Sequence, residues 1–405
     1  MDKLIKIAVI GGGASGLMAA IAAKDEHTAV TVYEKEKRVG RKILATGNGR
    51  CNMTNINASE LDYHGSDVSF MRDVIDKFWV GDTLLFFQSL GVLWKEEDGG
   101  KVYPYSDTAS AVLDVLRRET ETKGVEILCE RAVKSIVKKG KNFTVTDSSG
   151  VKLNYDKVIV ATGGKAGSQL GSDGSGYALL KSFGHKITSV YPSLVQIKTE
   201  TETVKKLKGI KVNATVSLGD KSKTGELLFT EYGISGPPVF WLSSYLYDNK
   251  EVTIDIMPEY TYSEIYDMLK KRVNVLADVA LEDFFVGMLN KRVSQAFLKH
   301  AGIEPLSRKA SSLSDKELKT VVSVIKGMKL KICGTSSWNN AQVTKGGALV
   351  SEFHSATMQS KLVKGLYACG ELLDIDGDCG GYNLQWAWSS GYVAGCSASG
   401  KEVIT

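Results

Sequence analysis

Apolar and polar positions along the first part of the chain follow the order strand, helix, strand. A continuous apolar run begins after Lys6 and ends at Gly11, small residues fill 14–20, and a second apolar run covers 28–33. Short continuous apolar runs are typical of strands buried on both faces, whereas a stretch of small residues without proline favours a helix. We therefore predict that one strand–helix–strand unit occupies 5–34.

The next section of the chain mixes helical and strand-like patterns. Helices are predicted near 67–90 and 107–123, where apolar residues recur at the spacing of one helix face. Apolar and polar residues alternate at 125–129, 132–139 and 142–147, which predicts a meander of neighbouring strands. We expect these helices and strands to follow one another in this order.

The pattern changes near residue 190 and later returns to that of the opening. Residues 190–260 read mainly as strands, and 261–328 read as amphipathic helices with exposed lysines. Further on, a strand over 364–370 ends in glycine and precedes a final helix over 384–398, which Asn383 can cap. The late strand and helix therefore belong with the opening unit rather than with the section between them.

This return of the opening pattern predicts a discontinuous domain. We expect an α/β fold in which 1–189 and 336–405 form one Rossmann-like domain. Residues 190–335 are then an inserted module that covers this domain.

The glycine loop after the first strand has the spacing of a dinucleotide-binding fingerprint. Gly11, Gly13 and Gly16 suit, in that order, a tight turn, close approach to a pyrophosphate and close packing of helix on strand. The second strand leads into Glu34, where the fingerprint places an acid for the ribose hydroxyls. The sequence therefore predicts a dinucleotide site at the N-terminus of the first helix.

Charge and composition exclude several other classes of protein. The 405 residues include 51 basic and 46 acidic side chains, a net charge of +5 that is too small to indicate a nucleic-acid partner. No apolar run approaches the ~20 residues that span a bilayer, so we expect no membrane partner. The N-terminal apolar run belongs to the nucleotide-binding strand, which argues against a signal peptide.

Cysteine and acidic residues give no metal-binding pattern. The six cysteines are scattered without a Cys-x-x-Cys pair, which favours a reducing, cytoplasmic setting. Asp374, Asp376 and Asp378 have the spacing of a calcium loop, but the glutamate that completes such a loop is missing. We expect no metal ion in this protein.

Glycine turns also follow two later strands, at 161–164 and 369–371, which is more than a nucleotide site alone requires. Such turns resemble those of flavoproteins of the glutathione-reductase type. Four further segments sharpen the resemblance, namely 40–52, 229–237, 343–347 and 370–383. Together they resemble the HI0933-like flavoprotein family, also described as YhiN/BaiN-like or aminoacetone-oxidase-like, over essentially the whole chain.

The resemblance implies a Rossmann-like FAD-binding domain of the glutathione-reductase type with an inserted module that is partly β-barrel-like and partly helical. It also implies which residues contact FAD. They are Gly11, Gly13, Ala14, Ser15, Gly16, Glu34, Lys35, Arg41, Lys42, Gly49, Arg50, Cys51, Asn52, Val133, Thr162, Gly163, Gly370, Glu371, Gly380, Gly381, Tyr382, Asn383 and Leu384.

Some of these side chains have a second interpretation. Arg41, Lys42 and Arg50 suit a cofactor phosphate or an anionic substrate, or they are exposed charges of a packed loop that is otherwise irregular. Cys51 is a candidate redox thiol with Cys379 as partner, or both are small residues in tight loops.

The final loop and helix give the other catalytic candidate. Tyr382 and Asn383 are expected to frame the flavin edge. Tyr382 therefore joins Cys51 as a candidate catalytic residue, although the flavin itself carries the chemistry.

The expected activity is FAD-dependent oxidoreduction of a small molecule, most simply the NAD(P)H-linked reduction of an organic substrate. No second glycine fingerprint is present, so NAD(P)H would bind transiently rather than in a dedicated domain. Three alternatives stay open at this point: an amine oxidase that uses oxygen on an aminoacetone-like substrate, a flavoprotein that modifies tRNA, and a non-catalytic redox sensor.

Overall fold

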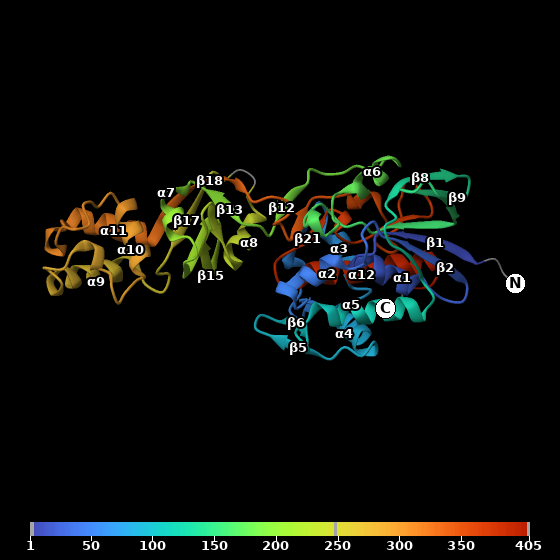
Figure 1. The fold of residues 1–405 in the computed structure, drawn as a ribbon, viewed down its shortest axis with the longest axis horizontal. Coiled ribbons are helices and arrows are strands. Elements are labelled where there is room, and N and C mark those ends of the chain that lie inside the picture. The colour runs from blue at the N-terminus through green and yellow to red at the C-terminus, as the bar shows by residue number, and fades with distance from the viewer. Residues whose placement is uncertain (1–3, 247–248, 403–405) are drawn as a thin grey trace. The chain divides into compact units, whose positions relative to one another are not determined.

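Figure 1 shows the computed structural model, which describes residues 4–246 and 249–402. The chain forms two compact units. The first unit is Met1–Pro192 with Ala341–Thr405, and the second unit is Ser193–Asn340. The sequence places the limits of the inserted module at 190 and 335, and each unit is described here by itself.

The first unit is built on a five-stranded parallel sheet, as predicted for a Rossmann-like fold. Its strands stand in the order β20-β11-β1-β2-β7, and their register is parallel throughout. Their bounds are β1 (Ile5–Ile10), β2 (Thr28–Tyr33), β7 (Glu126–Leu128), β11 (Lys157–Val160) and β20 (Leu366–Ala368). Strand β20, from the last part of the chain, pairs with β11 and so closes the discontinuous sheet.

Residues 125–129 do not join the meander that the sequence predicts. Strand β7 extends the parallel sheet beside β2, and only β8, β9 and β10 form the antiparallel meander. Three residues contain too few alternating positions for the sequence to show which of the two sheets the strand joins. The meander strands are β8 (Val133–Lys139), β9 (Asn142–Asp147) and β10 (Lys152–Tyr155).

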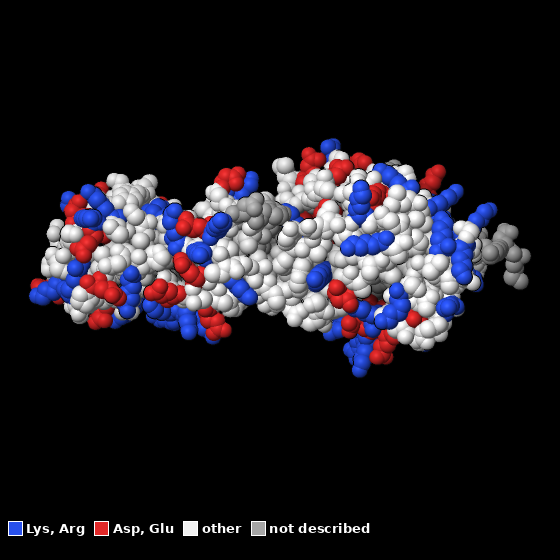
Figure 2. Space-filling view, turned by 90° about the horizontal axis from the view of Figure 1, so that it is seen from above, with Lys and Arg blue, Asp and Glu red and all other residues white. Residues whose placement is uncertain are grey.

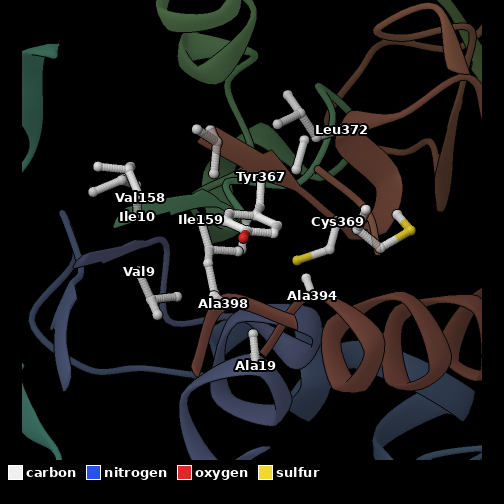
Figure 3. Packing of buried hydrophobic residues seen from close by; sticks show 14 of the residues in the cluster. Val9, Ile10, Ala19, Val158, Ile159, Tyr367, Cys369, Leu372, Ala394 and Ala398 are labelled. Carbon is white, nitrogen blue, oxygen red and sulfur yellow. The ribbon is translucent and has the colours of Figure 1, made fainter. Parts of the chain in front are cut away.

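Two helices pack directly on each other beside this sheet through small residues. They are α1 (Ala14–Ala23) and α12 (Tyr382–Ser399). Ala19 of α1 and Ala394 and Ala398 of α12 lie between the helices and the buried strand residues (Figure 3). A Cβ added at Gly391 would stand 2.4 Å from the Ser15 carbonyl oxygen, so only glycine permits this approach. The middle of α12 is thereby held close to the start of α1.

The remaining elements of the first unit surround this core. They are α2 (Arg41–Ala45), α3 (Val68–Ile75), α4 (Val80–Ser89), α5 (Ala109–Thr122), α6 (Ser175–Lys181), β3 (Thr54–Asn55), β4 (Tyr63–Gly65), β5 (Trp94–Glu97), β6 (Lys101–Pro104), β19 (Val343–Lys345) and β21 (Ile375–Gly377). One predicted helix over 67–90 is two helices in the structure, because Asp67 caps the first and Asp82 forms a capping box that starts the second.

The second unit contains a closed barrel, which confirms the predicted β-barrel-like part. Its strands are β13 (Ile197–Thr199), β14 (Lys211–Leu218), β15 (Lys221–Phe229), β16 (Gly233–Ser235), β17 (Glu251–Asp255) and β18 (Met328–Thr335). The strand order is β13-β16-β15-β14-β17-β18, and β18 closes the barrel by pairing with both β13 and β17.

Three longer helices lie between barrel strands β17 and β18 in the chain. They are α9 (Tyr262–Val275), α10 (Lys291–His300) and α11 (Asp315–Gly327), and a shorter helix, α8 (Pro237–Ser243), packs on β15. Buried side chains of the barrel and of the helices form one hydrophobic core.

Across residues 4–246 and 249–402, every helix is too short or too polar to cross a bilayer. Basic and acidic side chains are interspersed over the face seen in Figure 2.

Candidate functional site

The glycine loop between β1 and α1 leaves the helix N-terminus open. Gly11 has a φ of +108°, and a Cβ added there would lie 2.5 Å from the Ala161 carbonyl oxygen at the end of β11. Gly13 is the N-cap of α1, and no side chain caps the helix there. A Cβ at Gly13 would meet no heavy atom within 4 Å. The loop therefore offers open space and unpaired N–H groups where an anion binds best.

Glu34 holds this loop in place from the end of β2. Its Oε2 accepts the Gly12 N–H at 2.9 Å, and its Oε1 accepts the Glu36 N–H at 2.8 Å. Burial raises the pKa of Glu34, whereas these two backbone hydrogen bonds lower it. Each carboxylate oxygen keeps a lone pair that can accept a ribose hydroxyl. The neighbouring Lys35 is paired with Asp173 at 2.6 Å.

The late glycine turn lies against the early one. A Cβ at Gly370 would stand 2.4 Å from the Ser15 hydroxyl oxygen, and the Trp386 indole N–H donates to the Gly370 carbonyl oxygen at 3.1 Å. Thr162 and Gly163 follow β11, which lies between β1 and β20 in the sheet. The three glycine turns therefore meet at one edge of the sheet, where their strands end.

The three cations of the 41–52 segment all have carboxylate partners. Arg41 pairs with Glu36, and Lys42 Nζ lies 2.6 Å from Glu371 Oε2. Glu371 Oε1 also accepts the Thr344 N–H at 2.8 Å. The structure therefore gives the first two cations a role in fixing acidic side chains of the site.

Arg50 has more partners than Arg41 or Lys42. It pairs with both Glu97 and Asp107, and its guanidinium lies 4.1 Å from the centroid of the Tyr103 ring.

Part of the predicted loop is helical. Arg41–Ala45 forms α2, because four good helix formers follow the left-handed Gly40.

Cys51 is buried and ill suited to redox chemistry. Its side chain is fully buried, and burial raises the pKa of the thiol to about 12. The thiol is therefore protonated at neutral pH, whereas the thiolate is the reactive form. Cys51 and Cys379 are both free cysteines in the structure.

The beginning of α12 differs from the prediction. The helix begins at Tyr382 with Gly381 as its N-cap, so Asn383 lies inside the first turn instead of capping it. The Asn383 side chain holds the preceding turn: its Oδ1 accepts the Gly377 N–H at 2.8 Å, and its Nδ2 donates to the Gly377 oxygen at 2.6 Å. Gly381 has a φ of +104°, a left-handed conformation that allows this earlier start.

Neighbours of this turn complete the site. The Tyr382 ring meets Tyr63 edge-on at 6.0 Å, and burial raises the pKa of Tyr382 to about 12. A Cβ at Gly381 would lie 2.9 Å from Asn52 Oδ1. This buried Asn52 oxygen has no hydrogen-bond partner among the residues that the structure describes. An orphaned polar atom at this position fits a bound polar ligand.

The remaining predicted contacts lie around the same sheet edge or beneath it. Gly49 ends the short 3-10 turn after α2 with a φ of +86°. Leu384 packs against a core cluster that contains Trp388, and Val133 packs against the core of the parallel sheet. Within the described part of the chain, no three His, Cys, Asp or Glu side chains are grouped as a metal site.

One feature of the site has no counterpart in the sequence prediction. Asp376 is 1% exposed, and burial raises the pKa of its carboxyl to about 7. In the sequence, the spacing of the aspartates resembles only that of a calcium loop. Alternation of acids in an otherwise apolar strand is the signal that could have indicated a buried carboxyl.

The fold and the site together define a flavoprotein of the Rossmann class. The family model described as "HI0933-like protein Rossmann domain" matches residues 5–397. The chain therefore belongs to the HI0933-like family, and it is an enzyme of the FAD-dependent oxidoreductase class.

Curated relatives match nearly the whole chain. The chain is 40% identical to a 3-dehydro-bile acid delta(4,6)-reductase of Clostridium scindens, over 97% of this chain and 99% of that protein. It is 30% identical to a ribosomal RNA dihydrouridine synthase of Escherichia coli, over 95% of this chain and 96% of that protein.

Solved structures show the same fold at much lower identity. A 3-ketosteroid delta1-dehydrogenase from Sterolibacterium denitrificans matches with a TM-score of 0.51 and 11% identity. The match covers 97% of this chain and 99% of that one. At this identity the likeness concerns the fold alone.

The residues at the sheet edge fit FAD. Gly13 leaves open space for the pyrophosphate. The unpartnered Asn52 oxygen can accept a hydrogen bond from the ligand, and the Glu34 carboxylate can accept one from a ribose hydroxyl. When bound, FAD supplies hydride transfer. The N-termini of α1 and α12 would each place about half a positive charge at the site, where it stabilises anionic groups.

Glu34→Ala is expected to weaken FAD binding by roughly 1.5–3 kcal/mol, because it removes charged hydrogen bonds to the ribose and to the loop. Equilibrium titration of the flavin-free protein with FAD measures this loss. Glu26→Ala is the control, since the Glu26 side chain is 85% exposed and lies outside the glycine loop. Equal FAD affinity in Glu34→Ala and the unchanged protein would contradict the ribose assignment.

Cys51 is expected to resist thiol reagents in the folded protein, because its thiol is buried and protonated. Peptide mapping after iodoacetamide treatment should find the exposed Cys333 labelled and Cys51 unlabelled. Rapid labelling of Cys51 in the native state would restore it as a candidate redox thiol.

Proposed function

We propose that the protein is a reductase that uses NAD(P)H, through FAD, to saturate a carbon–carbon double bond conjugated with a carbonyl group in a small organic molecule. We further propose that it acts in the cytoplasm. The main support is the 40% identity to the bile acid reductase, which extends over nearly the full length of both chains.

The chemistry shared by the two kinds of relative supports the same reaction class. The name of the bile acid enzyme describes reduction of double bonds in a 3-oxo steroid, and dihydrouridine is uridine with a reduced ring double bond. In both compounds the double bond is conjugated with a carbonyl. A conjugated double bond of this kind accepts a hydride at the carbon remote from the carbonyl.

The described residues favour transient use of NAD(P)H. They contain one five-stranded parallel sheet, and the fingerprint loop occurs once, at Gly11–Gly16. That loop is the proposed FAD site, so a nicotinamide would reduce the flavin and then leave. Transient binding of this kind predicts saturable flavin reduction without a stable nicotinamide complex.

Anaerobic mixing of the yellow protein with NADH, with NADPH and with a panel of amines tests the proposal. We expect one of the two nicotinamides to bleach the flavin within seconds and a 3-oxo-4,6-diene steroid to restore its colour. Bleaching by an amine alone, with reoxidation only by oxygen, would favour the amine oxidase instead.

A uridine in ribosomal RNA is a second candidate substrate. The identity to the E. coli dihydrouridine synthase supports it. Cations also lie over aromatic rings on the barrel: Lys223 Nζ is 5.4 Å from the Trp241 ring centroid, and Lys221 Nζ is 5.8 Å from that of Tyr245. Mixed basic and aromatic surfaces suit RNA. Incubation of the reduced protein with unmodified ribosomal RNA, followed by nucleoside analysis, tests this candidate.

A further inference from the structure

Three aspartates share one face at strand β21. Asp374, Asp376 and Asp378 alternate where β21 pairs antiparallel with β4, and Asp376 is the register partner of His64. Side chains at every second position of a strand point to the same face. His64 Nε2 lies 2.7 Å from Asp378 Oδ1. The imidazole therefore belongs to the same face as the three acids.

Asp376 is the most deeply buried and least satisfied member of this group. Its side chain is 1% exposed, and neither carboxylate oxygen has a hydrogen-bond partner among the described residues. Burial of an unpaired charge is costly, so such a group remains neutral over a wider pH range. Accordingly, burial raises the pKa of Asp376 to about 7. At neutral pH a large share of the molecules carries a protonated Asp376.

The charges around Asp376 act in both directions. Lys345 and His64 lower its pKa, whereas Asp374 and Glu371 raise it. Burial in turn lowers the pKa of Lys345, whose neighbouring aspartates raise it. The titratable groups on the elements packed against β21 are Lys345 on β19, Tyr63 and His64 on β4, and Tyr382 on α12. Glu371 lies just after β20, and Asp374 and Asp378 flank β21 itself.

The position of Asp376 relates it to the proposed flavin site. Gly377 follows it directly and is held by Asn383 in the first turn of α12. The same turn follows Gly380 and Gly381, and a Cβ at Gly381 would lie 2.9 Å from the unpartnered Asn52 oxygen. The neutral carboxyl is therefore tied, through Gly377, to the turn beside this candidate ligand contact.

We propose that Asp376 is the proton donor that completes reduction of the conjugated double bond, an inference that rests on the proposed function. One carbon of the double bond gains a hydride from the reduced cofactor, which is oxidised. The other carbon gains the proton of the Asp376 carboxyl, whose O–H bond breaks and leaves a carboxylate. A proton from solvent then restores the acid before the next turnover.

The burial of the carboxyl serves this role. Bulk water does not reach it, so the proton is retained, and the strand must be uncovered before a bound molecule can contact the carboxyl. A general acid works best with a pKa near the operating pH, which an ordinary solvated aspartate does not have. Burial raises this pKa, and the three charged neighbours on other elements adjust it without forming a hydrogen bond to the carboxyl.

Infrared titration of the FAD-containing protein tests the protonation state without any turnover. The difference between the unchanged protein and Asp376→Asn is expected to show a carboxylic acid C=O band that disappears between about pH 6 and about pH 8. Asp374→Asn is the matched control on the same strand face and should retain this band. A carboxylate signal for Asp376 already at about pH 5 would overturn the proposal.

Single-turnover kinetics test the proton donation itself. Each protein is reduced anaerobically with dithionite and mixed with a 3-oxo-4,6-diene steroid or with ferricyanide, which accepts electrons without a proton. We expect Asp376→Asn to slow reoxidation by the steroid about 100- to 10,000-fold and to leave that by ferricyanide unchanged. Asp376→Glu, which keeps the acid, should recover part of the rate and a dependence on pH.

The outcomes separate this inference from the proposed function. If the unchanged protein reacts with the steroid and Asp376→Asn reacts equally fast with the same pH profile, the inference is wrong. If the unchanged protein does not react with the steroid, the proposed function is wrong, and the infrared titration alone decides whether Asp376 holds a proton at neutral pH.

Discussion

Gly13→Asp is expected to fold as stably as the unchanged protein and to bind FAD at least about 100-fold more weakly, a loss of about 3 kcal/mol. Gly13 has a φ of −84° and open space around its Cβ position, so the new side chain fits the flavin-free protein. Aspartate is also a favourable N-cap. The introduced carboxylate would occupy the anion site at the start of α1 and repel the pyrophosphate.

Gly81→Asp is the matched control for this prediction. Gly81 lies in the first turn of α4 and also has no heavy atom within 4 Å of a Cβ position. Urea denaturation of the flavin-free proteins measures stability, and titration with FAD measures affinity. If Gly13→Asp bound FAD as tightly as Gly81→Asp, the pyrophosphate would not lie at this helix.

Asp376→Asn is expected to raise the free energy of unfolding of the flavin-free protein more above pH 7 than near pH 4. The gain above pH 7 exceeds the gain near pH 4 by up to about 4 kcal/mol. The carboxyl has a pKa of about 7 in the folded protein and 3.8 as its ordinary value. Between these values the folded state binds more protons than the unfolded state, so stability falls as pH rises through this range. Asparagine does not titrate and removes this loss.

Urea denaturation at a series of pH values measures the effect. Asp147→Asn provides a control of opposite sign, because hydrogen bonds from Ser149 and Val151 lower the pKa of Asp147. Its contribution to stability is present above the ordinary pKa of aspartate and is lost as pH falls. A pH-independent difference between Asp376→Asn and the unchanged protein would show that the carboxyl has the same pKa in the folded and unfolded states.

The sequence predicts well those parts of the fold and site that depend on residues close together in the chain. The apolar strand, the glycine loop and the small-residue helix are consecutive, so β1 and α1 follow from one stretch of sequence. The return of a glycine-ended strand near the C-terminus likewise predicts that β20 joins the first sheet. These features depend on residues close together in the chain or on a motif with fixed spacing.

Long-range pairing accounts for what the sequence does not show. Lys42 meets Glu371 from 329 positions away, and His185 bonds to Glu352 and Ser360 although no local pattern indicates a partner. The burial of Asp376 likewise depends on β4, which is more than 300 positions away in the chain, and on β19, which belongs to a separate sequence segment. Charge type is visible in sequence, but the partner and the degree of burial follow only from the assembled fold.

Product analysis tests the central claim most directly. The FAD-containing protein is incubated without oxygen with NADH or NADPH and a 3-oxo-4,6-diene steroid, and the steroid is examined by mass spectrometry. The account predicts a product that has gained two hydrogens for each double bond reduced, with one nicotinamide oxidised for each such gain. Recovery of unchanged steroid, together with flavin reduction by an amine, would contradict it.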